Sequence, residues 1–418
     1  MNLVRLALAS AWNRRWTLAL TVIAVALAVL LLLGVERVRG AARASFAASV
    51  SGTDLVVGAR SGPIQLMLLA IFRLGNASAN MSWKSYETIA ADPGVAWSVP
   101  ISLGDSHRGF PVVGTTSAYF ERFRYGRSIA LAFAAGKPFV GVFDAVLGAE
   151  VAARLRLQVG DRIILSHGTS LAGPEHGDKP FTVVGVLERT GTPVDRSVHV
   201  SLEGIEAIHL GWQAGMPPPG FAIPAELVKK FDLSPKSITA ALVGLKSRAA
   251  VFEAQRRFNG HAEEALSAVM PGIALDELWD TLDAAERALS ALAILVVLVS
   301  LAGLVAVLLA GLGERRRELA ILRSVGAGPR AIVGLVIAEM LIVTFVGAII
   351  GLAGLSLVCV AAGPAIAAYA GLSVLPVLPS AAEWIALAAV LIVGALAGLL
   401  PALRALRYSL ADGLTPRL

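Results

Sequence analysis

The chain has 418 residues, of which 56% are hydrophobic and 16% charged, and its formal net charge is +6. Soluble domains are usually about 45–50% apolar, so this composition excludes an ordinary soluble protein and indicates a membrane protein with a substantial water-facing part. The single cysteine, Cys359, excludes an intramolecular disulfide and a zinc site built from cysteine pairs.

Four segments have the roughly 20 consecutive apolar residues that a membrane-spanning helix needs. They are 16–35, 288–312, 332–360 and 384–403. A cleaved signal peptide is the alternative for the first segment, with Arg14 and Arg15 as its basic region. The apolar run is longer than the about 7–15 residues of such peptides, which favours a permanent span.

The short segments outside these spans are strongly basic. Segments 1–15, 313–331 and 404–418 hold eleven arginines against three acidic residues. By the positive-inside rule we expect them in the cytoplasm, as an N-terminal interfacial helix, a loop and a tail. Residues 36–287 and the short loop 361–383 then lie outside. This topology accounts for the basic surplus, so no nucleic-acid partner is expected.

Residues 36–287 are predicted to form a large α+β domain inserted between the first and second of four transmembrane helices. Strands rich in Val, Ile and Phe, bounded by Gly, Pro or Asp, are predicted at 54–59, 95–103, 110–116, 137–143, 161–167, 181–188 and 197–202. Helices are expected at 84–91, 148–155 and 262–269.

A stripe of apolar residues precedes the second span. Leu278, Leu282, Ala285, Leu289 and Leu292 recur at the spacing of a coiled coil. We therefore expect the second span to continue outward as a stalk helix packed against another helix. The alternative is an amphipathic helix docked on its own domain.

The stretch GPIQLMLLAIFRLG (62–75) contains seven consecutive apolar residues, too few to span a membrane. One interpretation is an exposed patch that contacts lipid, an acyl chain or a partner. The side chains concerned would be Leu66, Leu68, Leu69, Ile71 and Phe72. A buried core helix is the alternative.

Residues 314–325, within the loop 313–331, can form about three helical turns. One face would carry Leu319, Leu322 and Gly326, and another would carry Arg316 and Arg323. Gly326 is expected to end the helix. Such a helix could lie on anionic lipid or bind a soluble cytoplasmic protein, and its charge alone does not decide between them.

The stretch ERRRELAILRSVGAGPRAIVGLVIAEMLIV, residues 314–343, resembles the FtsX-like permease domain of ABC transporters of the MacB, LolC/LolE and FtsX type. The matching positions are Arg317-Glu318, Leu322-Arg323, Gly326-Ala327, Ile332 and Glu339. The resemblance covers 285–410. The outside domain also resembles the MacB-type periplasmic core, chiefly over 146–165 and 181–191.

In that family the short cytoplasmic helix is a coupling helix that docks on an ATP-binding subunit. The resemblance thus implies ATPase-coupling roles for Arg316, Arg317, Glu318, Leu319, Leu322, Arg323 and Gly326. The sequence contains no GxxxxGK[ST] phosphate-binding loop, so ATP and magnesium are expected in a separate ATPase and no cofactor in this chain. The resemblance further implies two ATPase copies, a second copy of this chain or a homologous permease, and the bacterial cytoplasmic (inner) membrane.

The resemblance also implies mechanotransmission: the coupling helices move with the ATPases, and the first two spans carry this motion to the periplasmic domain. The work could export or release a lipoprotein, lipid, peptide or amphipathic substrate, with or without a periplasmic or membrane-fusion partner. Glu339 is expected to be a structural group within the third span. Alternatives are an ATPase-linked regulator of an envelope enzyme, or a membrane-anchored receptor or scaffold that does not transport.

An enzyme is a further rival interpretation. The outside domain carries all six histidines, but no Ser-His-Asp or paired-carboxylate arrangement is evident, and we predict no catalytic residue. His167, His176 and Asp178 lie in one loop and could bind a metal together with Glu175. A solvated polar loop is the favoured alternative, so no metal site is predicted.

Overall fold

The computed structural model describes residues 15–76, 79–168, 174, 176–212, 223–228, 230–314, 316–324, 326–370 and 378–407. It forms two compact units. The helical unit comprises residues up to Ala41, Asp283–Ile366 and Val374 onward, and the α+β unit comprises Ala42–Leu282 with Ala367–Ser373. The predicted interfacial helix and most of the predicted C-terminal tail lie outside the described residues.

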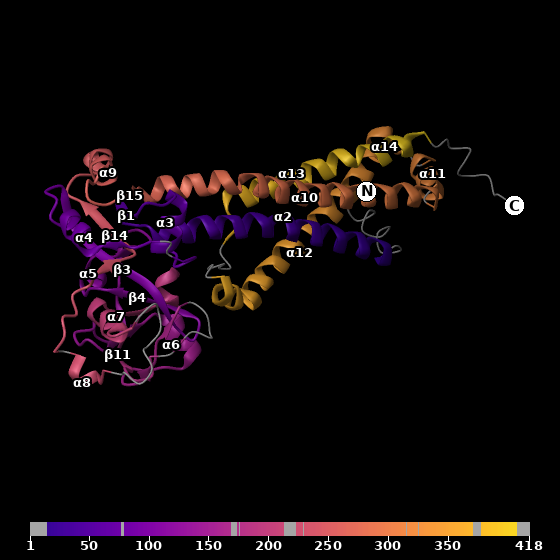
Figure 1. The fold of residues 1–418 in the computed structure, drawn as a ribbon. Coiled ribbons are helices and arrows are strands. Elements are labelled where there is room, and N and C mark those ends of the chain that lie inside the picture. The colour runs from indigo at the N-terminus through magenta and orange to yellow at the C-terminus, as the bar shows by residue number, and fades with distance from the viewer. Residues whose placement is uncertain are drawn as a thin grey trace. The chain divides into compact units, whose positions relative to one another are not determined.

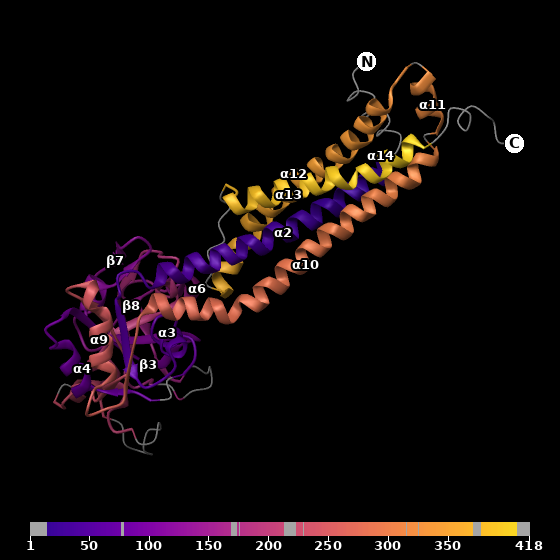
Figure 2. The same ribbon diagram turned by 90° about the horizontal axis from the view of Figure 1, so that it is seen from above.

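Four long apolar helices build the helical unit and lie side by side (Figures 1 and 2). They are α2 (Arg15–Ser49), α10 (Pro271–Glu314), α12 (Pro329–Ala370) and α13 (Ala381–Ala397), the last continued by α14 (Leu399–Leu406). In the described part of the chain, these four segments are long and apolar enough to cross a membrane. Each predicted span lies within one of them, although α12 continues ten residues past the predicted end at 360.

Glycines let α12 approach α2 closely. A Cβ added at Gly351 would lie 2.6 Å from the carbonyl oxygen of Ala26, and one at Gly347 would lie 2.8 Å from the Cβ of Val25. Gly394 of α13 similarly faces Thr344 of α12. Small residues are what close helix contacts in membranes require, because there dispersion contacts replace the hydrophobic drive that packs helices in water.

The helices alternate in direction. At one end, Leu312 of α10, Ile332 of α12 and Ala402 of α14 share a buried cluster. At the other end, Arg37 near the end of the apolar part of α2 contacts Glu383 at the start of α13. The start of α12 and the end of the α13–α14 segment therefore lie together, as consecutive antiparallel spans require.

The α+β unit is built on one large sheet with the strand order β15-β1-β14-β3-β4-β12-β8-β11-β7. The pairs β4–β12 and β8–β11 are parallel and the other neighbours are antiparallel. The strands are β1 (Leu55–Ala59), β3 (Val95–His107), β4 (Phe110–Thr115), β7 (Phe133–Gly136), β8 (Asp144–Leu147), β11 (Phe181–Leu187), β12 (Val198–Ser201), β14 (Ala240–Leu245) and β15 (Leu266–Val269).

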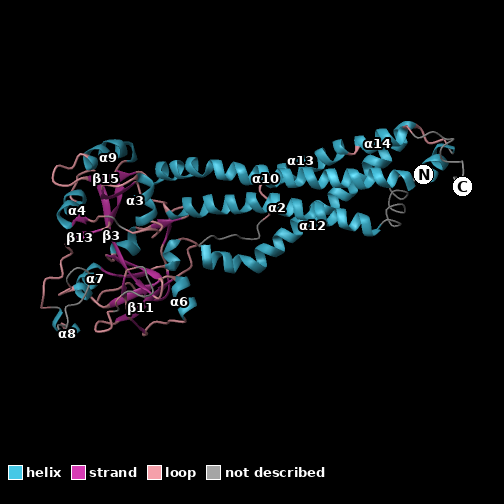
Figure 3. Ribbon diagram, turned by 45° about the vertical axis from the view of Figure 1, so that its right-hand side comes forward, coloured by secondary structure: helices cyan, strands magenta, loops and turns pink. Residues whose placement is uncertain are grey.

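Short strands and helices complete the unit (Figure 3). β9 (Arg162–Ile163) pairs with β11 and β10 (Ser166–His167) with β3, while β2 (Met81–Ser82) pairs with β13 (Ser237–Ile238) and β5 (Arg124–Tyr125) with β6 (Ile129–Ala130). The helices are α3 (Pro63–Ala70), α4 (Trp83–Ala90), α5 (Ala118–Arg122), α6 (Ala149–Leu155), α7 (Leu202–His209), α8 (Ala225–Val228) and α9 (Val251–Asn259).

Two predicted elements are wrong. Residues 262–269 were expected to form a helix, but Leu266–Val269 form the edge strand β15, which pairs antiparallel with β1. Residues 137–143 were expected to form a strand, but the strand is β7, at Phe133–Gly136, and 137–143 are irregular.

The apolar stretch 62–75 belongs to the core. Leu66, Leu69, Ile71 and Phe72 are buried in the cluster that also holds Val99 of β3, and Leu68 packs against it while half-buried. These side chains are therefore not accessible to lipid or an acyl chain, because they are already buried against other apolar side chains inside the unit. The core-helix alternative describes them, and the predicted exposed contact is corrected accordingly.

The apolar stripe of the predicted stalk divides in two. Leu278 packs against the core of the α+β unit, as a docked helix would. Leu282, Leu289 and Leu292 are exposed on α10. The beginning of α10 is therefore docked on its own domain, as the alternative predicted. Among the described residues, nothing buries the other leucines of the stripe.

Candidate functional site

The first candidate site is α11 (Arg316–Ser324), a separate helix between α10 and α12. Leu319 and Ala320 are buried, and Leu319 shares a cluster with Leu312 of α10 and Ile332 of α12. Gly326 has a φ of +97°, a conformation that favours glycine and commonly ends a helix. The apolar face of α11 is thus packed against the ends of α10 and α12.

The outer face of α11 is mixed. Glu318 and Ser324 are exposed, Leu322 and Arg323 are half-buried, and Ile321 is 56% exposed. The side chains of Arg316 and Arg317 lie outside the described residues. Sequence reasoning missed Ile321, which at about 100° per residue lies on the side of the helix opposite to both Leu319 and Arg323.

Glu339 is buried within α12. Its neighbour in sequence, Met340, belongs to a cluster that includes Leu18 of α2 and Leu304 of α10. Arg330 is exposed at the start of the same helix. The burial of Glu339 among apolar helices agrees with a structural group, but its role stays a prediction.

Aromatic side chains join α2 and α10 inside the α+β unit. Phe46, in the last turns of α2, stacks on Phe72 with ring centroids 4.3 Å apart, and meets Trp279 of α10 edge-on at 5.5 Å. The guanidinium of Arg43 lies 5.3 Å from the centre of the Trp279 ring. The last turns of α2 and the first turns of α10 therefore pack against the same core as the sheet.

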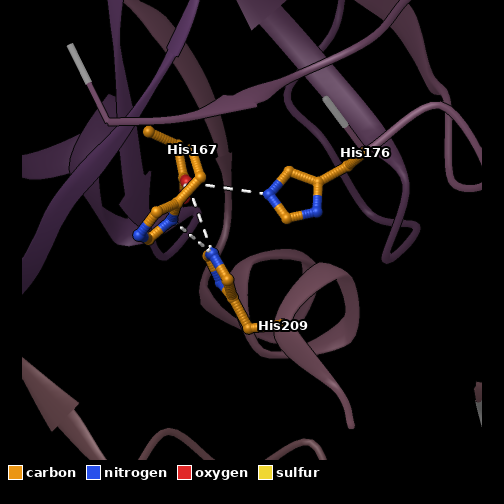
Figure 4. Close-up of side chains that lie close together, drawn as sticks. His167, His176 and His209 are labelled. Carbon is orange, nitrogen blue, oxygen red and sulfur yellow. Dashed lines mark hydrogen bonds and ion pairs between the residues drawn. The ribbon is translucent and has the colours of Figure 1, made fainter. Parts of the chain in front are cut away.

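The second candidate site is a group of histidines around one carboxylate (Figure 4). Asp105 and three histidines each present one ligand atom, and these four atoms all lie within 4.8 Å of one another. The histidines are His167, His176 and His209. In Figure 4 their rings converge on one point from three separate segments of the chain.

Strand pairing and a helix end assemble this histidine cluster. Asp105 lies on β3, just where the β3–β4 register shifts between Leu103 and Ser106. β10 pairs with β3 so that His167 is opposite Asp105. The hydroxyl of Ser201 caps α7 by accepting a hydrogen bond from the backbone N–H of Gly204 at 3.0 Å, and α7 ends at His209.

The contacts within the cluster are short. Nδ1 of His167 lies 3.2 Å from Oδ1 of Asp105 and 3.0 Å from Nε2 of His209. Oδ1 of Asp105 is also 3.4 Å from Nε2 of His209 and 3.9 Å from Nε2 of His176. One carboxylate oxygen therefore faces all three imidazoles.

Burial and mutual contact shift the pKa values of these groups. Burial alone would raise the pKa of Asp105, but hydrogen bonds from His167 and His209, together with the charges of His209 and His176, hold it at about 2. Burial and the neighbouring His209 lower the pKa of His176 to about 4. Burial would lower the pKa of His209, yet its contact with Asp105 raises it overall. The cluster thus holds one permanent negative charge beside imidazoles of different basicity.

The structure brings together His167 and His176, which were considered from sequence, but not Asp178. The Asp178 carboxylate instead pairs with Lys179, with 3.1 Å between Oδ2 and Nζ. Glu175 lies outside the described residues. Asp105 and His209 were missed because they lie far from the loop in sequence, and only the pairing of β10 with β3 reveals Asp105.

Comparisons with known proteins match two parts of the chain to family models. The family model of the MacB-like periplasmic core domain matches residues 18–259, and that of the FtsX-like permease C-terminal domain matches residues 290–410. No curated protein matches the chain.

Two solved structures are similar over the outer domain. One is the periplasmic region of MacB from Actinobacillus actinomycetemcomitans, at 11% identity and a TM-score of 0.33, covering 57% of this chain and 97% of that one. The other is the extracellular domain of the noncanonic ABC-type transporter YknZ from Gram-positive bacteria, at 15% identity and a TM-score of 0.30, covering 52% and 99%. The family matches, and not these low structural scores, identify the family.

Proposed function

Because the chain belongs to the family of ABC transporter permease components that join a MacB-like periplasmic core domain to an FtsX-like domain, we propose that it transmits the conformational change of a separate ATPase to its outer domain. Members of this family are membrane proteins with an extracytoplasmic domain, typically without enzymatic activity of their own, and their transporters include an ATPase. In our proposal both termini and α11 are cytoplasmic, and two copies of the permease act with two ATPase subunits.

The observation that carries the proposal is the attachment of α11. Its Leu319 is buried against the ends of α10 and α12, while Glu318 and Ile321 on the same helix remain exposed. A helix with one face packed against the spans and another exposed can accept a partner without unfolding. Docking of an ATPase on the exposed face would therefore move the ends of the spans.

The transmission path runs through α10. This helix is continuous over 44 residues, or about 66 Å at 1.5 Å per residue, from Pro271 to Glu314. Its N-terminal turns carry Leu278 and Trp279, which pack on the core of the α+β unit, and its C-terminal end carries Leu312, which contacts α11 and α12. No loop interrupts this helix, which is why we propose that it carries the displacement.

Substrate chemistry is a separate question. The apolar stretch around Leu66–Phe72 does not support an acylated substrate, because those side chains are in the core. The first, second and fourth predicted spans contain no charged residue and therefore offer no polar path through the membrane. These observations favour work on the outer domain over passage through a central pore.

A labelling experiment tests the orientation. Ile321→Cys and Arg248→Cys would be introduced separately into a Cys359→Ser background, and intact cells treated with a membrane-impermeant maleimide. Arg248 is highly exposed in the α+β unit. We expect Cys at 248 to react in intact cells and Cys at 321 to react only after permeabilisation. Equal labelling of both before permeabilisation would overturn the topology and the proposal with it.

A cross-linking experiment tests the partner. A photoactivatable reagent attached to Cys at 321 should link the chain to a polypeptide that contains a GxxxxGK[ST] loop and hydrolyses ATP. The matched control is Phe345→Cys, because Phe345 is similarly exposed but lies in the middle of α12. Adducts at 345 with the same polypeptide, or none at 321, would favour a scaffold without energy coupling.

A further inference from the structure

We propose that Asp105, His167, His176 and His209 form a tetrahedral binding site for a divalent transition-metal ion of the zinc type in the α+β unit. The inference goes beyond the proposed function, because it concerns only the outer domain and needs no ATPase.

The distances fit a tetrahedral ion. With zinc–ligand bonds of about 2.0–2.1 Å, the four ligand atoms of a tetrahedron lie about 3.3 Å apart. Oδ1 of Asp105 lies 3.2 Å from Nδ1 of His167 and 3.4 Å from Nε2 of His209, and the two histidine nitrogens are 3.0 Å apart. Three of the four corners are therefore already at the spacing that a bound ion would impose.

The environment of His176 is a second, independent observation that points to a bound ion. Its side chain is fully buried, yet neither ring nitrogen has a hydrogen-bond partner among the described residues. Its Nε2 is 3.9 Å from Oδ1 of Asp105, which is beyond hydrogen-bond distance. A buried ring nitrogen without a hydrogen-bond partner destabilises the folded state. To complete the tetrahedron, this nitrogen would have to move from 3.9 Å to about 3.3 Å from Oδ1 of Asp105.

Surrounding contacts hold the rings in a ligating orientation. Nδ1 of His209 donates a hydrogen bond to the backbone carbonyl of Ile205 at 2.9 Å, which directs the lone pair of Nε2 into the cluster. The ring of Trp212 packs on His176, with centroids 4.2 Å apart, and covers the cluster from one side. Metal-binding histidines usually have such a carbonyl on the other ring nitrogen, because it fixes the tautomer.

The donor set selects the class of metal. Three imidazoles and one carboxylate suit zinc and its first-row neighbours, whereas magnesium and calcium prefer oxygen ligands. Four protein ligands also complete a tetrahedron, while catalytic zinc sites keep one position for water. We therefore assign a structural ion that joins β3, β10, the segment before Lys179 and the end of α7.

The buried histidine His199 shows what distinguishes the cluster. It is as buried as His176, but its ring lies beside Tyr119 and Phe120, at 5.2 and 5.9 Å between centroids. Among the described residues it belongs to no group of metal-ligating side chains. It therefore serves as an aromatic-like core residue, and burial alone does not define the site.

The test uses the full-length chain purified in detergent with a tag that contains no histidine. After removal of metal by a chelator, zinc would be titrated calorimetrically and cobalt(II) followed by its visible absorption. We expect one ion per chain, a Kd below about 1 µM, and the intense visible band of tetrahedral cobalt. Absence of saturable binding, or an octahedral cobalt spectrum, would overturn the site.

Variants locate the ion. His176→Ala and His209→Ala should each weaken zinc binding more than about 100-fold, because replacing residues that only orient the ligands already weakens it about 10–100-fold. Asp178→Asn and His261→Ala are the controls and should bind as the parent does, since neither side chain belongs to the cluster. If His176→Ala fails to fold, His167→Ala replaces it, because that side chain is 38% exposed. Unchanged binding in both ligand variants, or equal loss in Asp178→Asn, would refute the assignment.

Discussion

Arg37 of α2 and Glu383 at the start of α13 form a buried, two-point ion pair. Nε of Arg37 is 2.8 Å from Oε1 of Glu383, and Nη2 is 3.1 Å from Oε2. The same carboxylate also accepts a hydrogen bond from the backbone N–H of Ser380 at 2.7 Å, which completes a capping box at the beginning of α13. One side chain thus fixes the start of one span to the end of another.

Removing one partner of this pair should destabilise the helical unit. Because a buried charge left without its partner is costly, we expect Glu383→Ala to lower the free energy of unfolding by about 3–5 kcal/mol. The double variant Arg37→Met/Glu383→Met should recover most of this loss, since it leaves no buried charge. Thermal unfolding in detergent measures both. Arg39→Met, which breaks the more exposed pair with Glu36, is the control and should cost less than about 1 kcal/mol.

Charge reversal on α11 should weaken ATPase coupling. We expect Arg323→Glu to reduce co-purification of the ATPase and its turnover at least several-fold, because the binding of a protein partner to α11 would depend on charge complementarity. Arg404→Glu makes the same change of charge at an exposed position of α14 and should leave the complex intact. Equal loss in both variants would mean a general attraction to basic residues and not docking on α11.

The close approach of α2 and α12 should tolerate no added methyl group at Gly351. A Cβ there would meet the carbonyl oxygen of Ala26 at 2.6 Å, so Gly351→Ala should push the helices apart and cost about 1–3 kcal/mol. Gly334 lies on the same helix with open space around it. Gly334→Ala should therefore be neutral or stabilising by up to about 1 kcal/mol, because alanine has the higher helix propensity. Similar melting temperatures for the two variants would contradict the packing described here.

The aromatic junction of α2 and α10 should be needed for coupling more than for assembly. Phe46→Ala removes the stack on Phe72 and the edge contact with Trp279, so we expect faster hydrogen exchange in residues 43–49 and 275–282. ATP turnover of the complex should persist while its dependence on the outer domain is lost. Phe252→Ala on α9 removes a phenyl ring that is 58% exposed and should change neither readout.

The spans could be predicted from sequence because the bilayer imposes a local rule on length and polarity. The outer domain was harder. Residues 262–269 have a composition that suits a helix, yet Leu266–Val269 pair with β1, and this tertiary contact overrides the local preference. The stretch Leu66–Phe72 could be described either as a surface patch or as core, and only its packing on the sheet decides.

The histidine cluster shows the same limit within one site. His167 and His176 are nine residues apart, so a sequence scan can consider them together. Asp105 and His209 join them through strand register and the end of a helix, which no local pattern encodes. Conversely, Asp178 has the right residue type and spacing but turns to Lys179. Proximity in sequence therefore groups two of the four cluster residues with Asp178, which lies outside the cluster, and no metal site was predicted from it.

The unbroken course of α10 makes its length a matter of helical phase. Each residue of an α-helix turns the chain by about 100°, so one residue inserted between Leu282 and Leu289 would rotate everything beyond it by that angle. Seven inserted residues would nearly restore the original facing while lengthening the helix by about 10 Å. If the mechanism depends on the rotational position of α10, the seven-residue insertion should be tolerated better than the one-residue insertion. If it depends only on the length of α10, the one-residue insertion should be tolerated better.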